Sequence, residues 1–197
     1  CGSIAIGAGG LEVALAMAGY PFQTPTPIVV GVHLEGGLPP WVASKDLILW
    51  LIRRYTVKGG LNRIFEFTGP GVADLPVTQR ATVCNMITEL GGTTAIFPSD
   101  DQTRRFLARQ RREDQWVELD PDPDAKYDEE VHVDLSTLEP LIAKPHQPYN
   151  VVPVAEVAGT PVFQVCFGST VNSWYEDLAS PAAVLAGRPL PPTTVGT

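Results

Sequence analysis

PIVVGVHLEGGLPPWVASKDLILWLIRRYTVKGGLNRIFEF, residues 27–67, is the stretch that decides the fold class. Its first eight residues carry apolar side chains at every second position from Ile28, which is the period of a β-strand. Ser44 is placed to cap a helix over 45–54, whose wide apolar face predicts burial. A short strand over 63–67 follows. Strand, helix and strand in succession predict an α/β layered architecture.

The rest of the chain continues this alternation. Helices are expected over 11–20, 76–90, 102–112 and 174–185, and strands over 93–97, 131–135 and 162–167. Ser99 or Asp100 is expected to cap the helix 102–112, and Pro181 is expected to kink or break the last helix. The proline-rich stretch 136–154 has no clear period and is interpreted as a connector. The tail 189–197 is expected to be frayed.

Charge and cysteine usage exclude several classes of protein. The chain has 197 residues and a formal net charge of −8, which argues against nucleic-acid binding because that depends on basic residues that neutralise phosphates. The acidic run over 118–130 is interpreted as a solvated loop. No apolar run approaches the ~20 residues that a bilayer span requires, and no signal peptide is visible. Three widely spaced cysteines predict no disulfide framework and a reducing cytoplasm.

Common catalytic and metal-binding patterns are missing from the sequence. His33, His132 and His146 have no metal-ligand spacing such as His-Glu-x-x-His, so each is interpreted as a core or surface histidine. Cys1 as an N-terminal nucleophile is disfavoured because no oxyanion site is visible. The arginine-rich helix 102–112 is interpreted as a solvated helix face.

Several segments together resemble the aconitase family. The strongest is KDLILWLIRRYTVKGG (45–60), and the others follow in the family's order: FEFTGPGV (65–72), ATVCNM (81–86), ELGGTTAIFPSD (89–100), PHQPYNVVPV (145–154), QVCFGS (164–169) and YEDL (175–178). The segments GPG (69–71) and FPSD (97–100) resemble aconitase itself more than the large subunit of isopropylmalate isomerase.

The resemblance implies a hydro-lyase that interconverts citrate and isocitrate through cis-aconitate, a reaction of the tricarboxylic acid cycle. Members hold a 4Fe–4S cluster by three cysteines, which leaves one iron open as a Lewis acid for a tricarboxylic acid substrate. Asn85 and Glu89 match family catalytic positions and are expected on one face of the helix 76–90. The alternative is that both are solvated helix residues. Ser169 and Asn172 match positions beside the cluster loop, with helix capping as the alternative.

The same loop departs from the family pattern. Thr170 stands where the first cluster cysteine is expected, and a threonine hydroxyl cannot replace a thiolate. The family's other two cluster cysteines and its Asp-Ser-His segment are expected outside residues 1–197. Cys1, Cys84 and Cys166 make a poor replacement set, so no metal is expected on this chain and Cys166 is only a weak candidate ligand. The 4Fe–4S cluster is therefore expected to be absent from this chain, and the chain alone is expected to be inactive.

The expected fold is a three-layer α/β/α arrangement of aconitase-type domains, truncated at both ends. Residues 1–44 are assigned to the end of domain 1, 45–140 to domain 2, 141–160 to a connector and 161–197 to the start of domain 3. The alternative to a hydro-lyase segment is a non-catalytic, aconitase-derived binding or interaction module. Exposed apolar surface is expected to drive self-association or association with missing aconitase portions. No nucleic-acid or membrane partner is expected.

Overall fold

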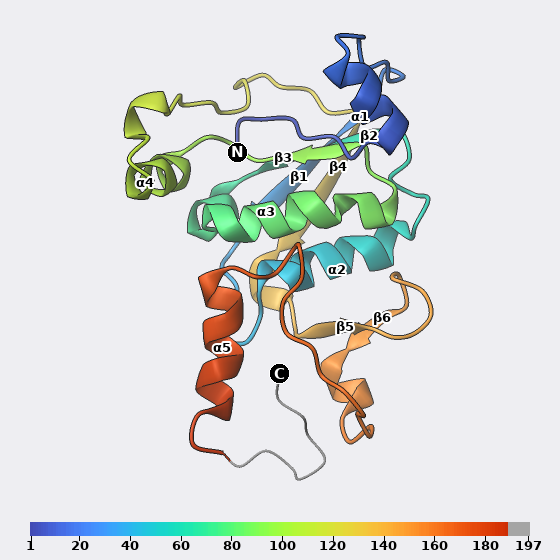
Figure 1. Ribbon diagram of the computed structural model, residues 1–197, viewed down its shortest axis with the longest axis vertical. Coiled ribbons are helices and arrows are strands. Elements are labelled where there is room, and N and C mark those ends of the chain that lie inside the picture. The colour runs from blue at the N-terminus through green and yellow to red at the C-terminus, as the bar shows by residue number, and fades with distance from the viewer. Residues whose placement is uncertain (189–197) are drawn as a thin grey trace. The chain divides into compact units, whose positions relative to one another are not determined.

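The computed structural model describes residues 1–188, so the tail 189–197 that was predicted to be frayed lies outside the described residues. The described residues divide into two compact units, 1–154 and 155–188 (Figure 1). None of the helices within residues 1–188 is long and apolar enough to cross a bilayer.

The first unit is built on a four-stranded parallel sheet in the order β3-β2-β1-β4. Its strands are β1 (Ile28–Glu35), β2 (Arg63–Thr68), β3 (Thr94–Ile96) and β4 (Glu129–Asp134). Val32 of β1 is in register with Phe67 of β2 and with Val131 of β4. Four of the predicted strands therefore exist, each within two residues of its expected bounds, and the predicted α/β class is confirmed.

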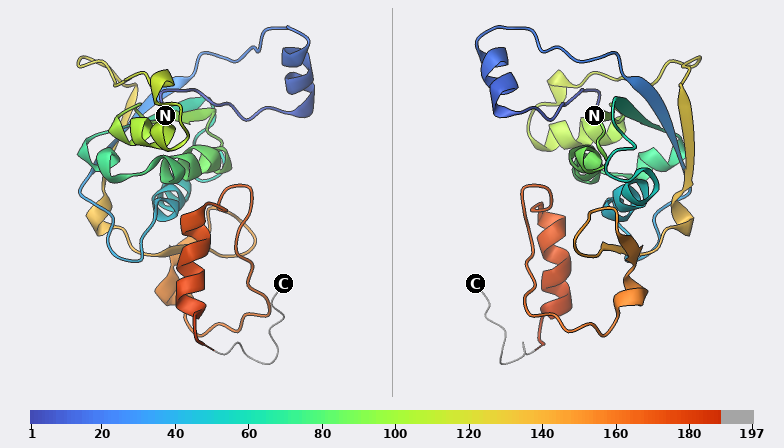
Figure 2. Two further views of the ribbon diagram at one scale, coloured as in Figure 1. Left: turned by 60° about the vertical axis from the view of Figure 1, so that its left-hand side comes forward. Right: turned by 90° about the vertical axis from the view of Figure 1, so that its right-hand side faces the viewer.

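The alternation of apolar side chains explains which face of the sheet is covered. Val30, Val32 and Leu34 of β1, and Phe65 and Phe67 of β2, have no exposed surface. They face α2 (Ser44–Tyr55) and α3 (Val77–Met86), which pack side by side against the sheet (Figure 2). The buried core therefore lies between these two helices and the sheet.

The start of α2 differs from the prediction that Ser44 caps it. Ser44 is the first residue of the helix, and the backbone N–H of Ala43 donates to Asp46 Oδ2 at 2.8 Å. The other oxygen, Asp46 Oδ1, accepts from the Leu141 N–H at 2.7 Å. A carboxylate at the third helical position thus closes the helix start and also anchors a segment 95 residues away.

That anchored segment corrects the connector interpretation of 136–154. It contains an antiparallel pair of short strands, β5 (Leu141–Ala143) and β6 (Val151–Pro153). Both strands pack against α2, and this tertiary contact, which no sequence period indicates, holds them in place. Helix α4 (Asp101–Arg109) is capped by Asp100, as predicted. The Asp100 side chain accepts from the N–H groups of Gln102 and Thr103.

Short 3₁₀ helices complete the first unit. They are η1 (Pro70–Asp74), η2 (Ile87–Leu90), η3 (Glu113–Gln115) and η4 (Leu135–Thr137). The short helix α1 (Gly10–Met17) has no buried residue in this unit. Strand β1, within the range assigned to a first domain, is hydrogen-bonded to strands of the range assigned to a second. The four-part domain assignment itself stays a prediction.

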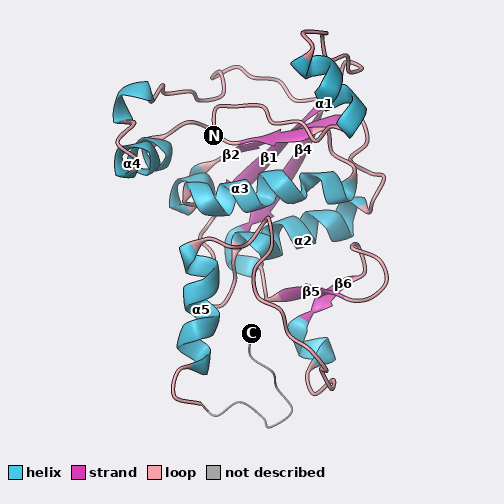
Figure 3. Ribbon diagram, in the orientation of Figure 1, coloured by secondary structure: helices cyan, strands magenta, loops and turns pink. Residues whose placement is uncertain are grey.

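The 3₁₀ helix η5 (Val154–Val157) begins at the last residue of the first unit, and the second unit carries one longer helix, α5 (Tyr175–Leu185) (Figure 3). The sequence predicted a kink or a break near Pro181; the helix continues through Pro181, so it is not broken there. The strand predicted over 162–167 is also wrong: these residues form an extended, exposed segment. An alternating apolar sequence forms a strand only beside a hydrogen-bonding partner, and no strand pairs with this segment within the described residues.

Candidate active-site cleft

A cleft of about 530 Å³ lies in the first unit, between the N-terminal segment, α3 and β3. From α3 and the turn that follows it, the lining residues include Val77, Arg80, Ala81, Cys84, Asn85 and Thr88. Their spacing of three, one, three, one and three is the stripe that one helix face presents. The face of α3 that lies beside β3 thus forms one wall.

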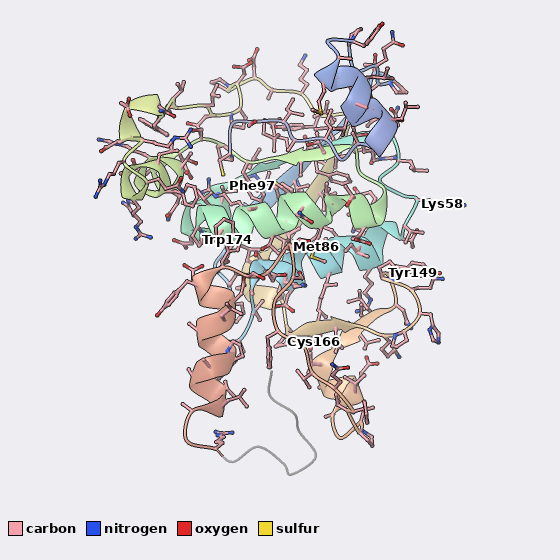
Figure 4. All side chains as sticks on the ribbon, viewed as in Figure 1. Lys58, Met86, Phe97, Tyr149, Cys166 and Trp174 are labelled. Carbon is pink, nitrogen blue, oxygen red and sulfur yellow. The ribbon has the colours of Figure 1, made fainter. Side chains whose placement is uncertain are left out.

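The N-terminal segment forms the opposite wall because β3 holds it in place. The Gly2 N–H donates to the Phe97 carbonyl at 2.8 Å, and the Thr94 hydroxyl donates to the Ala5 carbonyl at 2.5 Å. Phe97, labelled in Figure 4, is itself fixed by stacking on Phe67 with ring centroids 4.3 Å apart. The segment therefore has a defined position along the cleft.

Arg80 is the most deeply buried charge of the cleft wall, with no exposed surface. Its Nη1 and Nη2 donate to Asp100 Oδ1 and Oδ2 at 2.9 and 2.6 Å. The same guanidinium donates to the carbonyls of Val72, Leu75 and Pro98 at 3.0, 2.8 and 3.1 Å. All of these bonds satisfy a buried cation, so Arg80 joins η1, α3 and the cap of α4.

Cys84 is also on the wall, one helical turn beyond Arg80. Its thiol donates to the Ala95 carbonyl at 3.5 Å. Burial raises the pKa of the Cys84 thiol to about 11, against partial opposition from the N-terminal amine and Arg80. Cys84 is therefore a protonated thiol at neutral pH and a poor nucleophile.

The two predicted catalytic residues differ in their relation to the cleft. Asn85 lines it and is exposed there. Glu89 is exposed but lies in η2, outside the lining, because α3 ends at Met86 and the last turn is a 3₁₀ turn. A 3₁₀ turn has three residues per turn, so the expectation that one continuous α-helical face carries both residues is corrected. Their catalytic roles stay predictions.

Ser169, Thr170 and Asn172 lie together in a turn of the second unit. The Ser169 hydroxyl accepts from the Val171 N–H at 3.1 Å, and Asn172 Nδ2 donates to Asp177 Oδ1 at 3.4 Å. These contacts lie at the turn before α5, but the residue that caps the helix is Trp174, whose N–H donates to Asp177 Oδ2 at 3.1 Å. The capping alternative for Ser169 and Asn172 is therefore wrong, and their family role stays a prediction. Thr170 is exposed, and Cys166 is exposed in the extended segment before this turn (Figure 4).

Within residues 1–188, no three His, Cys, Asp or Glu side chains are gathered closely enough to hold a metal ion as they stand. The three cysteines of the described part are free thiols.

Arg80 was missed by sequence reasoning. The sequence does carry a signal for it, because Arg80 falls on the same helical stripe as the apolar residues Val83 and Ile87. An arginine in such a stripe is expected to be buried with a carboxylate partner. All three side chains are buried, with at most 1% of their surface exposed. The partner, Asp100, was recognised only as a cap.

Comparison with known proteins gives the family. A family model described as Aconitase family (aconitate hydratase) matches residues 1–167. The chain is 40% identical over 191 residues to the 3-isopropylmalate dehydratase large subunit 2 of Rubrobacter xylanophilus, covering 97% of this chain and 45% of that protein. It is 42% identical over 187 residues to the 3-isopropylmalate dehydratase large subunit of Oleidesulfovibrio alaskensis, covering 95% and 44%.

A relative with a different name is the aconitase–ribosomal protein bL21m fusion protein of Schizosaccharomyces pombe, 37% identical over 195 residues, covering 90% of this chain and 21% of that protein. The chain spans somewhat less than half the length of the dehydratase large subunits that it matches. Because the family model covers most of the chain, and because the likeness to these enzymes extends along nearly all of it, the chain belongs to the aconitase family.

Proposed function

We propose that this chain is a portion of a hydro-lyase that removes water from a hydroxy carboxylic acid and adds it back. The observation that carries the proposal is the 40% identity to a dehydratase along 97% of the chain. The position of Asn85 in a cleft supports it. The segments 69–71 and 97–100 favour citrate and isocitrate as the substrate pair, and the names of the dehydratase relatives favour 3-isopropylmalate as the alternative.

The cleft residues have limited chemistry of their own. The Asn85 amide offers both a donor and an acceptor, which suits it to orient a substrate hydroxyl or carboxylate. Arg80 is already paired with Asp100 and bonded to three carbonyls, so its role is to hold the wall rather than to bind a substrate carboxylate. We propose that the cationic side chains which bind substrate carboxylates lie outside this chain. We also propose that the enzyme contains a smaller partner subunit.

Enzymes of this family are typically 4Fe–4S proteins, but the described residues do not fit a cluster by themselves. Thr170 offers a hydroxyl where a soft thiolate is required, and no three ligand side chains converge in residues 1–188. We propose that any cluster depends on cysteines from elsewhere and that the chain alone does not catalyse the dehydration. Three free thiols in the described part favour a cytoplasmic location.

Thr170 also favours a second candidate function. If no other residue replaces the missing thiolate, the chain is a non-catalytic member of the family that persists as a binding module. Its exposed apolar side chains, including Leu11, Met17 and Phe163, suit such a role.

A pair of chimeric enzymes separates the two candidates. The chain replaces the matching segment of the Rubrobacter dehydratase large subunit in one chimera and of the aconitase portion of the S. pombe fusion protein in the other. Each is made with Thr170 and with Thr170→Cys, and alkene formation from 3-isopropylmalate or isocitrate is followed by ultraviolet absorbance. We expect turnover from at least one Thr170→Cys chimera, and the host that works indicates the substrate class.

Asn85→Ala in the active chimera tests the cleft directly. Loss of a positioned polar group at a reacting centre lowers kcat by roughly 10²-fold or more, whereas Gln110→Ala, an exposed amide at the end of α4, leaves it unchanged. A Thr170→Cys chimera that folds and binds iron but turns over neither acid would refute the hydro-lyase proposal. Equal turnover with Thr170 and with Cys would refute the stated role of Thr170.

A further inference from the structure

Two histidines that the sequence pattern left apart lie side by side on the sheet. His33 of β1 is in register with His132 of β4. Neighbouring strands lie about 4.8 Å apart, and the two imidazole centroids are 5.5 Å apart with a tilt of 52°. Both side chains point to the face opposite α2 and α3, since their neighbours Val32 and Val131 are buried on the helix side.

This position is removed from the cleft, which lies on the helix-covered side. Both histidines are third from the last residue of their strands, near the carboxyl ends. In open α/β sheets, this is the edge at which ligands are held. The histidine side chains are 38% and 68% exposed, so an ion in solution can reach them.

The surroundings of His33 fix its ring. Its Nδ1 lies 3.3 Å from the Thr68 hydroxyl, and the ring sits against Gly69, where a Cβ atom would come within 2.9 Å of it. Gly69 has a φ of +90°, a conformation that favours glycine. A hydrogen bond at Nδ1 and a backbone wall orient the ring so that Nε2 faces outward, as second-shell partners orient metal-ligating histidines.

Carboxylates flank the pair. Glu35 Oε1 lies 3.5 Å from His33 Nε2, and Glu130 Oε2 lies 3.8 Å from His132 Nε2. Both glutamates are more than 60% exposed, so they can turn about their side-chain bonds. Imidazole with carboxylate is a ligand set for zinc, nickel and copper rather than for calcium or magnesium, which prefer oxygen alone.

We propose that His33 and His132, joined by Glu35, bind a divalent transition-metal ion of the zinc class at the carboxyl ends of β1 and β4. As placed, these side chains do not converge on one point. The ion would draw His132 Nε2 and the Glu35 carboxylate toward the fixed Nε2 of His33 and would keep water at its open position.

The test uses Zn²⁺ on the full chain with Cys1→Ser and Cys166→Ser, because accessible thiols and the N-terminal cysteine would compete for the ion. Calorimetry gives the stoichiometry and affinity, and proton NMR follows the ring signals of the three histidines. We expect one Zn²⁺ per chain, with the signals of His33 and His132 shifted and that of His146 unchanged. His33→Asn and His132→Asn should each lower the affinity at least tenfold, and His146→Asn should not.

Far-UV circular dichroism of each variant shows that the fold is kept, which the exposure of His132 favours. Zn²⁺ affinity that is unchanged in both His33→Asn and His132→Asn would overturn the proposal. Equal shifts of all three histidine signals would overturn it too, because they would indicate adventitious surface binding.

Discussion

Replacing Arg80 by methionine should destabilise the protein more than any surface substitution. The guanidinium has no exposed surface, and it forms two bonds with Asp100 and three with backbone carbonyls. Methionine fills most of the volume but donates nothing. Three carbonyls then lose a donor and Asp100, only 24% exposed, loses its counter-charge.

The magnitude follows from these losses. Removing one partner of a buried ion pair costs about 3–5 kcal/mol, and this figure already contains much of the cost of unpaired acceptors. Since a domain's free energy of unfolding is about 5–15 kcal/mol, the loss would be a large share of it. We expect Arg80→Met to lower the free energy of unfolding in urea by about 3–5 kcal/mol.

A double-mutant cycle makes the measurement specific. Asn caps a helix nearly as well as Asp, so Asp100→Asn removes the charge and keeps a cap on α4. We expect a coupling energy above about 1.5 kcal/mol between the two substitutions, as for a charged hydrogen-bonded pair. Arg105→Met, on the exposed part of α4, is the matched control and should change stability by less than about 0.5 kcal/mol. An Arg80→Met loss below about 1 kcal/mol, or no coupling, would refute this reasoning.

Three further predictions follow from other parts of the structure. Because the pKa of Cys84 is raised to about 11, the folded state holds this proton more tightly than the unfolded state. The free energy of unfolding should therefore be constant below pH 9 and fall as pH rises from 9 to 11, and it should fall less in Cys84→Ala. Identical pH profiles for the two proteins would contradict this. Iodoacetamide at pH 8 should label exposed Cys166 well before Cys84, as peptide mass spectrometry would show, and equal labelling rates would count against the burial of Cys84. Gly31→Ala places a Cβ atom within 2.5 Å of the Tyr127 ring and should cost about 1–3 kcal/mol of stability in urea unfolding, whereas an unchanged midpoint would mean that Tyr127 does not pack there.

Self-association can be tested on the intact chain. Leu11 and Met17 of α1 are 71% and 86% exposed, and Phe163 of the second unit is fully exposed. Exposed apolar groups of this size drive association. We expect light scattering during gel filtration to give a mass above that of a monomer, falling toward it in Leu11→Ser with Met17→Ser. A clean monomer for the unaltered chain would contradict the expectation.

The sequence predicted the elements whose order is local. Alternation in β1 and the apolar face of α2 indicated the sheet and its covering helix, because burial on one side imposes a period on the residues themselves. The pair β5 and β6 could not be predicted in this way. Each strand has three residues, too few to show a period, and both depend on Asp46 and α2 for their position.

The candidate site was predicted only in part. Asn85 was identified by family resemblance, and the structure places it on the cleft. Glu89 was placed on the same helical face because a sequence does not reveal where an α-helix tightens into a 3₁₀ turn. The pairing of His33 with His132 depends on the register of strands about a hundred residues apart in the chain, which no local pattern contains.

The most direct test of the central claim is the iron and acid-labile sulfide content per chain after anaerobic reconstitution. We propose that this chain is a portion of a hydro-lyase and that its described residues do not hold a cluster without further cysteines. We therefore expect near-zero iron and sulfide for the chain alone, and a cluster in the chimera that carries Thr170→Cys. A stoichiometric cluster on the unaltered chain would contradict this proposal and would make Cys1, Cys84 and Cys166 the first ligands to test.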